Sequence, residues 1–369
     1  MTTNIEIELI KNVNLNNKDE NFVISPTGIE IVLSLISNGA DGETQKEILQ
    51  LLKYKDLDEA NNISKEIIEQ TRKDKDILSI ATAVLTKVKA KAKFIKKGLE
   101  DYDSKIEELK NFHQVNIWAK NKTKNNIVKI IDSISPKVLM ILLNAIYFEA
   151  FWKIPFDPKE NIDREFYNLD DEANKVNVSM MFLSGQLLNY YENDFIQSVK
   201  LNYETKNDSI NAIIILPKEN INFYIKHFNN KNYEEIIDGL KKEKKKVNLF
   251  LPKFEVEYKI DLNQILIDLG IKKAFTNDAE FKNICDKSPI HIGQVIQKNY
   301  INVNEKGTQA ASVTQLDVIL ESFKEGDPEA INFIANKPFI FLLVNEKFPK
   351  GHDILFFTKF CKIEVFDDY

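Results

Sequence analysis

Histidine and cysteine are the side chains of this chain that could carry acid–base, nucleophilic or metal chemistry. The four histidines and two cysteines are scattered through the 369 residues, at His113, His227, His291, His352, Cys285 and Cys361. No cysteine lies at metal-ligand spacing from a histidine, and the Gly-x-Ser-x-Gly, His-Glu-x-x-His, Walker and Gly-x-Gly-x-x-Gly patterns are all absent. We therefore expect that the protein is not an enzyme and that it uses neither a metal nor a cofactor.

One segment differs from the rest of the chain in composition. Residues 305–316 read EKGTQAASVTQL, a run of small and hydroxyl-bearing side chains that is free of bulky groups until Leu316. Taking alternate residues gives a set that is uniformly compatible with burial, namely Thr308, Ala310, Ser312, Thr314, Leu316, Val318 and Leu320. A strand would place this set on one face. Since Gly326 and Asp327-Pro328 are typical of an exposed loop, two interpretations stay open, an ordinary edge strand or a conformational switch.

The elements that must position this segment change in type along the chain. Ser25 and Pro26 form a helix start, followed by apolar residues at helical spacing up to Asn38-Gly39. Thr44 and Glu47 form a capping-box pattern that predicts a second helix. Up to about residue 135 the pattern is mostly helical, with one strand near 77–85.

Later residues favour strands. Short β-rich runs occur at 138–148, 212–216, 247–251, 294–303, 339–344 and 354–365. Helices early and strands late predict an α+β architecture. The chain has only 11 glycines and no Gly/Ser-rich or Pro-rich linker, which predicts a single domain over residues 1–369.

Charge and hydropathy bear on partners and compartment. Fifty basic against 56 acidic residues leave a formal charge of -6, which gives no general attraction to nucleic acid or anionic membranes. The first residues show no secretion signal, and no apolar run approaches the ~18 residues of a membrane span. We expect a soluble cytoplasmic protein, with export by a non-classical route left open.

Several segments together resemble the serpin family, the serine protease inhibitor superfamily, in its intracellular, ovalbumin-like type. EKGTQAASVT, from Glu305 to Thr314, is similar to the family's proximal hinge. Other matching segments follow in the family's order, namely NFVISPTGIEIVLSLISNGADGETQKEIL (21–49), LLNAIYFEAFWKIPF (142–156), LPKFEVEY (251–258), DLGIKKAF (268–275) and NKPFIFLLV (336–344). The resemblance covers essentially the whole chain. It implies the serpin fold, with about nine helices around three β-sheets, and places the hinge and an exposed reactive-centre loop at 305–328.

The resemblance also implies a mechanism and a set of site residues. A protease attacks the loop as a substrate, forms an acyl-enzyme and is distorted when the hinge inserts into the main sheet as a new strand. The implied hinge residues are Glu305, Gly307, Thr308, Gln309, Ala310, Ala311, Ser312 and Thr314. Ser25 and Asn144 match the polar cluster beneath the main sheet, called the shutter. Trp152 matches the aromatic residue at the loop's entry point, called the breach, and Gln297 stands where the family usually has histidine.

The residue at the scissile bond determines which protease is inhibited. Counting from Gly307 by the commonest family spacing places this bond at Glu321-Ser322, with alternatives at Leu320, Phe323 and Lys324. Glutamate suits proteases that prefer acidic residues, including caspase-like cysteine enzymes. Phe323 or Leu320 suits chymotrypsin or cathepsin G types, and Lys324 suits trypsin types. We expect a monomer whose partner is a protease, of serine type first.

A non-inhibitory serpin, acting as a chaperone, carrier or storage protein, is the alternative. The hinge of such a protein normally contains bulky or charged residues. This chain instead keeps Gly307, Thr308, Ala310, Ala311, Ser312 and Thr314. The hinge composition therefore favours inhibition.

Overall fold

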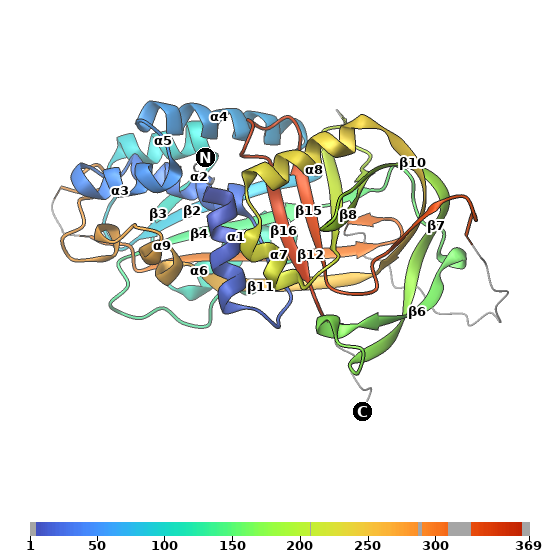
Figure 1. Ribbon diagram of the computed structural model, residues 1–369. Coiled ribbons are helices and arrows are strands. Elements are labelled where there is room, and N and C mark those ends of the chain that lie inside the picture. Colours follow the sequence, from blue (N-terminus) through green and yellow to red (C-terminus); the bar gives the residue numbers. More distant parts are fainter. Residues whose placement is uncertain (1–4, 207, 287–289, 309–325, 364–369) are drawn as a thin grey trace.

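The computed structural model describes residues 5–206, 208–286, 290–308 and 326–363 (Figure 1). Within these ranges there are nine α-helices, most of them in the first third of the chain. They are α1 (Ile5–Asn16), α2 (Pro26–Ser37), α3 (Gly42–Leu52), α4 (Leu57–Lys73), α5 (Ala92–Tyr102), α6 (Phe112–Lys122), α7 (Ile221–His227), α8 (Asn230–Lys242) and α9 (Asn263–Asp268). Strands predominate after residue 138, and the α+β class is confirmed.

Seven strands form what we call the main sheet, in the order β3-β2-β4-β12-β13-β5, with β11 paired to β12. Their bounds are β2 (Leu78–Thr86), β3 (Lys105–Glu108), β4 (Met140–Phe148), β5 (Ala150–Phe151), β11 (Phe254–Asp261), β12 (Gln294–Asn304) and β13 (Gly307–Thr308). The central strands β4 and β12 run parallel to each other. This arrangement matters for the site described below.

The other nine strands form a second sheet in the order β1-β16-β15-β9-β8-β7-β10-β14, with β6 paired to β7. Their bounds are β1 (Phe22–Ile24), β6 (Ile162–Tyr167), β7 (Lys175–Glu192), β8 (Ile196–Asn202), β9 (Ile210–Pro217), β10 (Lys244–Pro252), β14 (Ile331–Ile334), β15 (Phe339–Asn345) and β16 (Ile354–Phe360). We expected three sheets, whereas the described residues form two. The long strand β7 accounts for the difference, because it pairs with β6 and β10 and then, through its last residues, with β8.

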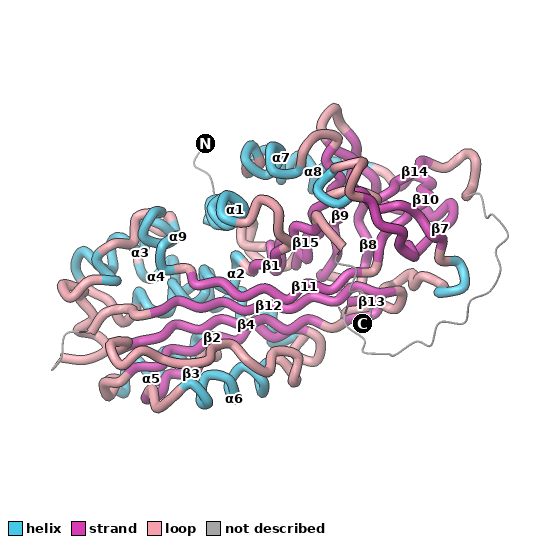
Figure 2. Tube along the Cα trace, turned by 90° about the horizontal axis from the view of Figure 1, so that it is seen from below, coloured by secondary structure: helices cyan, strands magenta, loops and turns pink. Residues whose placement is uncertain are grey.

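The main sheet is covered on both faces. Helix α6 lies along one face (Figure 2), where it shares an apolar cluster with β2, β4 and β12. Helix α2 packs against β2 and β4 and also against β16 of the second sheet. Among the described residues, no helix combines the length and apolar character that crossing a membrane requires.

The beginning of α2 follows the sequence pattern. The Ser25 hydroxyl accepts a hydrogen bond from the Gly28 backbone N–H at 3.1 Å, and Pro26 occupies the first turn. Every residue of the helix is buried, and the helix ends before Asn38 as expected. Burial on all sides indicates that tertiary packing stabilises this helix.

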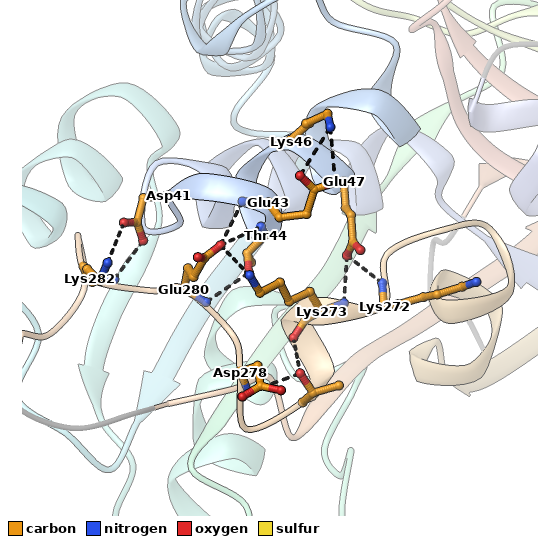
Figure 3. A network of polar contacts seen from close by, with 11 residues as sticks. Asp41, Glu43, Thr44, Lys46, Glu47, Lys272, Lys273, Asp278, Glu280 and Lys282 are labelled. Carbon is orange, nitrogen blue, oxygen red and sulfur yellow. Dashed lines mark hydrogen bonds and ion pairs between the residues drawn. The ribbon is translucent and has the colours of Figure 1, made fainter.

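The capping box predicted for α3 is wrong. The helix begins at Gly42, so that Thr44 lies within its first turn. The Glu280 carboxylate instead accepts hydrogen bonds from the N–H groups of Glu43 (2.8 Å) and Thr44 (3.4 Å). Glu47 reaches the other way and accepts from the backbone N–H groups of residues 272 and 273, at 2.8 and 2.7 Å (Figure 3). These reciprocal bonds tie α3 to the segment that leads into β12.

Candidate functional site

The small-residue segment begins inside the main sheet. After β12 ends at Asn304, residues 305 and 306 turn the chain, and β13 returns antiparallel to β12 with Asn304 opposite Gly307. On its other edge β13 pairs antiparallel with β5, with Gly307 opposite Phe151 and Thr308 opposite Ala150. Gly307 and Thr308, the third and fourth residues of the segment, are therefore paired as a strand between β12 and β5.

Beyond the end of β13, β12 pairs with β4, the strand that precedes β5 in the chain. β4 and β12 pair directly, in parallel, from Ile141 opposite Gln294 to Ile146 opposite Asn299. A strand that continued β13 would have to separate them along this stretch. It would run antiparallel to both neighbours, as β13 does now.

Glycine is required at position 307 by close packing. A Cβ atom at Gly307 would lie 2.0 Å from the Ala150 carbonyl oxygen and 2.8 Å from the Phe151 Cα atom. Both are backbone atoms that cannot move aside like a flexible side chain. Only glycine therefore lets β13 approach β5 this closely. The next residue, Thr308, is 1% exposed.

An aromatic pair holds the point at which β13 enters the sheet. The Trp152 indole N–H donates to the Asn304 carbonyl oxygen at 2.8 Å, and its backbone N–H donates to the Lys306 carbonyl oxygen at 2.8 Å. The ring stacks on Tyr203 with centroids 4.3 Å apart, and the Tyr203 and Thr308 hydroxyls are hydrogen-bonded. Burial raises the pKa of Tyr203 well above its ordinary value, so the hydroxyl stays protonated.

Glu305 anchors the turn before the hinge strand. Its carboxylate accepts a hydrogen bond from the Asn161 amide at 2.7 Å and lies 3.0 Å from the Lys253 ammonium group. Its carbonyl oxygen accepts from the Phe156 N–H at 3.0 Å. Burial raises the pKa of Glu305, but the bonds from Asn161 and Lys253 outweigh this effect and lower it below the usual value. The carboxylate is therefore charged at neutral pH.

A second polar cluster lies beneath the sheet. The Gln297 amide accepts from the Ser25 N–H at 2.8 Å and donates to the Ser25 carbonyl oxygen at 2.9 Å and to Asn144 Oδ1 at 2.7 Å. Asn299 donates to Gln297 Oε1 at 2.8 Å. All four side chains are at most 2% exposed. Gln297 thus joins the start of α2, through Ser25, to β4, through Asn144.

Close packing against α2 completes this cluster. Asn144 donates to the Ala81 carbonyl oxygen of β2 at 3.2 Å. A Cβ atom at Gly28 would lie 2.3 Å from Asn144 Oδ1, so the absence of a side chain there leaves room for the amide. The cluster formed by Ser25, Asn144, Gln297 and Asn299 contains no titratable side chain.

The structure thus brings the described candidate residues together at two places along β12. At one place Trp152 is hydrogen-bonded to Asn304 and Lys306, which flank Glu305 and precede Gly307 and Thr308, and at the other Ser25, Asn144 and Gln297 meet. The remaining candidates lie outside the described residues, namely Gln309, Ala310, Ala311, Ser312, Thr314, Leu320, Glu321, Ser322, Phe323 and Lys324. In the part of the chain that the structure describes, no group of three His, Cys, Asp or Glu side chains is arranged to hold a metal.

Tyr203 and Asn299 are among the residues of these clusters that were not found from the sequence. Tyr203 follows a strand that the sequence analysis did not predict, and nothing in its immediate neighbours indicates a contact with Thr308. Asn299 lies two positions from Gln297 on β12, so its side chain projects from the same face. That alternation is the one signal that could have identified it.

Comparison with known proteins decides the family. The sequence profile described as Serpin (serine protease inhibitor) matches residues 1–363. The chain belongs to the serpin family. This serpin is 27% identical over 365 residues to Antichymotrypsin-2 of Bombyx mori, which covers 92% of each chain.

Solved structures agree with this assignment. Serpin48 of the insect Tenebrio molitor is 25% identical, with a TM-score of 0.81 over 98% of this serpin and 97% of that chain. Human thyroxine-binding globulin, which is 23% identical, has the same fold, with a TM-score of 0.84 over 97% of this serpin and 96% of that chain. Serpins in general act as protease inhibitors and not as enzymes, although thyroxine-binding globulin is non-inhibitory.

Proposed function

We propose that this serpin is a suicide-substrate inhibitor of an endopeptidase, of serine type first. The observation that carries the proposal is the pairing of β13 with both β12 and β5. Gly307 and Thr308 already occupy the first positions of an additional strand in the main sheet. The small residues that follow, from Ala310 to Thr314, are compatible with continuing that strand.

The covalent step takes place on the reactive-centre loop, outside the described residues. The protease's serine hydroxyl loses its proton and attacks the carbonyl carbon of Glu321. The bond to the Ser322 nitrogen breaks, that nitrogen leaves with a proton, and an ester joins the protease to Glu321. Cleavage frees the hinge from the chain that follows it. β13 then lengthens into the sheet before water hydrolyses the ester.

The change in strand pairing favours this insertion energetically. Insertion breaks the parallel pairing of β4 with β12 and forms antiparallel pairings on both sides of the new strand, and antiparallel pairs are slightly more stable. A net ~1 kcal/mol per hydrogen bond is largely offset by ~1 to 2 kcal/mol of ordering entropy per residue. We infer that burial of Leu316, Val318 and Leu320, at about 1.5 to 3 kcal/mol each, drives insertion of the metastable protein.

The inserted length suits the displacement of a protease. About 14 residues at about 3.3 Å each would carry the bound protease about 45 Å. This distance is comparable with the length of a domain. The protease would therefore move from one end of the main sheet to the other.

The segment after α6 crosses the strands that must separate. The Asn116 amide holds it by accepting from the N–H groups of Ile130 (2.8 Å) and Ile131 (3.1 Å). The segment is also bonded to β12, because the Lys298 ammonium group donates to the Lys129 carbonyl oxygen at 2.7 Å. We propose that this segment shifts during insertion, since it contacts β12 while packing with β4 in one apolar cluster.

The target class depends on the scissile bond. Cleavage after Glu321 corresponds to a protease that prefers acidic residues. Cleavage after Phe323 or Leu320 corresponds to a chymotrypsin-like protease, the type that the name of the Bombyx mori relative indicates for that protein. Lys324 corresponds to a trypsin-like protease.

A protease panel tests the proposal. The serpin is incubated with chymotrypsin, cathepsin G, trypsin, a granzyme that cleaves after acidic residues and a caspase. Denaturing electrophoresis then detects covalent complexes, and mass spectrometry identifies the released fragment. We expect a complex with at least one protease. A fragment that begins at Ser322 would place the bond at Glu321, and one that begins at Lys324 would place it at Phe323. Cleavage by every protease without a complex would overturn the proposal in favour of a chaperone, carrier or storage role.

A further inference from the structure

A surface pocket of about 360 Å³ lies where the β7–β8 turn and the end of β9 meet helices α7 and α8. Its walls include the rings of Phe195, Phe223, Tyr224 and His227. None of these residues belongs to the hinge or to the cluster around Gln297. The pocket is therefore separate from the machinery proposed for protease inhibition.

The two phenylalanines of this pocket are unusually exposed. Phe195 is 60% exposed and Phe223 is 53% exposed. They come from different parts of the chain and line the same pocket. Exposed aromatic side chains that converge on a cavity commonly mark a ligand site. The Phe223 ring also lies beside the His227 ring, with centroids 4.2 Å apart.

The charge of the lining is one-sided. Glu219 and Glu235 both line the pocket, whereas no lysine or arginine does. The neighbouring Lys218 is directed to Glu192, 2.7 Å away. The Tyr191 hydroxyl donates to one carboxylate oxygen of Glu235 at 2.6 Å, and a carboxylate has further acceptor sites for a ligand. The pocket thus combines aromatic walls with negative charge.

Asparagine side chains fix the backbone that carries these rings. Asn193 accepts from the Phe195 N–H at 2.9 Å, and Asn220 caps α7 by accepting from the Phe223 N–H at 3.2 Å. Asn229 caps α8 in the same way. The walls are therefore held in place without a ligand, which reduces the entropy lost on binding.

We propose that this pocket binds a small organic ammonium compound that carries an aromatic ring, in other words an arylalkylamine. Aromatic faces attract an ammonium group, and the two carboxylates complement its positive charge. The volume is in the range that small-molecule sites occupy. This binding is independent of protease inhibition and of the residue at the scissile bond.

Two probes that differ only in charge test the proposal. Tryptamine and indole-3-propionate share the indole ring and a two-carbon linker, but one ends in an ammonium group and the other in a carboxylate. Titration calorimetry of the full chain at pH 7 and low salt should give one tryptamine site. The affinity for indole-3-propionate should be at least about tenfold lower. Equal affinities, or no tryptamine binding at millimolar concentration, would overturn the proposal.

Variants locate the binding. Phe223→Ala and Glu235→Gln should each weaken tryptamine binding by about tenfold, since one removes an aromatic wall and the other a charge. Leu99→Ala on α5 is the matched control, because Leu99 is 63% exposed and does not line the pocket. Circular dichroism verifies that each variant is folded. If the control and the pocket variants bound tryptamine alike, the assignment of the ligand to this pocket would be wrong.

Discussion

The hydroxyl groups of Tyr203 and Thr308 share a hydrogen bond at the point where β13 joins the main sheet. Tyr203 stacks on Trp152, whose indole N–H is bonded to the end of β12. The first buried side chain of the hinge is therefore held by an aromatic pair that is itself fixed to the sheet.

Removing this hydroxyl should loosen the hinge. Tyr203→Phe leaves the buried Thr308 hydroxyl without its partner, at a cost of about 1 to 3 kcal/mol. We expect faster hydrogen exchange at the amides of residues 307 and 308 and a lower free energy of unfolding. Tyr167→Phe is the control, because that hydroxyl bonds Glu165 at the surface. Unchanged exchange at the hinge would show that the hydroxyl pair does not hold it.

A charge at position 308 should convert an inhibitor into a substrate. Thr308 is buried between β12 and β5, so Thr308→Arg would place an unpaired charge in the sheet, which costs several kcal/mol. We expect the variant to be cleaved by the target protease with little covalent complex. Thr308→Ser keeps the hydroxyl and should inhibit normally. Unchanged complex yield for Thr308→Arg would mean that insertion does not require a small uncharged side chain at this position.

The amide cluster beneath the sheet should be sensitive to an apolar substitution. Gln297→Leu removes the partners of the Ser25 backbone groups and of Asn144, which are buried. We expect a loss of about 3 kcal/mol or more in urea unfolding. Gln264→Leu, at an exposed position on α9, should change stability by less than about 0.5 kcal/mol. Equal effects of the two variants would rule out a structural role for the cluster.

Buried acidic groups also meet near the start of β16. Glu6 of α1 accepts a hydrogen bond from the Thr27 hydroxyl at 3.2 Å. The His352 ring lies 2.7 Å from the carboxylate of Glu30 on α2. The hydroxyl of Tyr233 on α8 donates to Asp353. Tyr54, which follows α3, donates to Glu30, and Glu59 of α4 adds charge near His352.

The pKa values of Glu6, Asp353 and His352 in this cluster are all raised. Burial, with repulsion from Asp353 and Glu30, raises the pKa of Glu6, and burial raises the pKa of Asp353. Burial lowers the pKa of His352, but its bond to Glu30 outweighs this effect and raises it. The folded protein therefore retains protons that the unfolded chain releases.

Stability should consequently fall as pH rises. A group whose pKa is raised in the folded state contributes its full stabilisation at pH values below its unfolded pKa. This contribution is lost as the pH rises through the folded pKa. We expect the free energy of unfolding to decrease as pH rises above the unfolded carboxyl pKa values of about 4 to 4.5. Glu6→Gln imitates the protonated group, so it should be more stable than the parent at about pH 8 by about 1 kcal/mol or more, and nearly equal at about pH 4, below the unfolded pKa. Glu8→Gln on the same helix is the control. A Glu6→Gln protein that kept the full pH dependence would contradict this account.

The hydrogen bonds of Glu280 and Glu47, which join α3 to the segment before β12, should lose stability in acid. This pH dependence is opposite in sign to that of Glu6. Bonds from Lys273 and from the α3 backbone lower the pKa of Glu280. Its contribution is therefore present above the unfolded pKa of about 4.5 and is lost as pH falls through the folded pKa. We expect Glu280→Gln to lower Tm by a few degrees at neutral pH and to have no effect once the carboxyl is protonated. Glu43→Gln, at an exposed position, serves as the comparison.

Local sequence patterns predicted the elements whose causes are local. The Ser25-Pro26 start of α2 and the apolar runs of β4, β12 and β15 are confirmed. The start of α3 was wrong because its cap comes from Glu280, more than 200 residues away. Strand β7 was missed because its burial does not alternate regularly along its length and it contains many polar residues.

The site was predictable only in part, for a similar reason. Gly307 and Thr308 belong to a recognisable run of residues, and both are buried in the sheet. Tyr203 comes from the end of a different strand, and only the folded chain brings it to Thr308. No local pattern encodes a contact between residues 105 positions apart.

The turn at residues 305 and 306 joins β13 directly to β12. The hinge is thus tethered beside the paired strands β4 and β12 that it would separate, at an effective concentration that a free peptide or a second copy of the chain reaches only when very concentrated. Insertion within one molecule should proceed at a rate independent of protein concentration. Dilution therefore suppresses the same pairing between two molecules and leaves self-insertion unchanged.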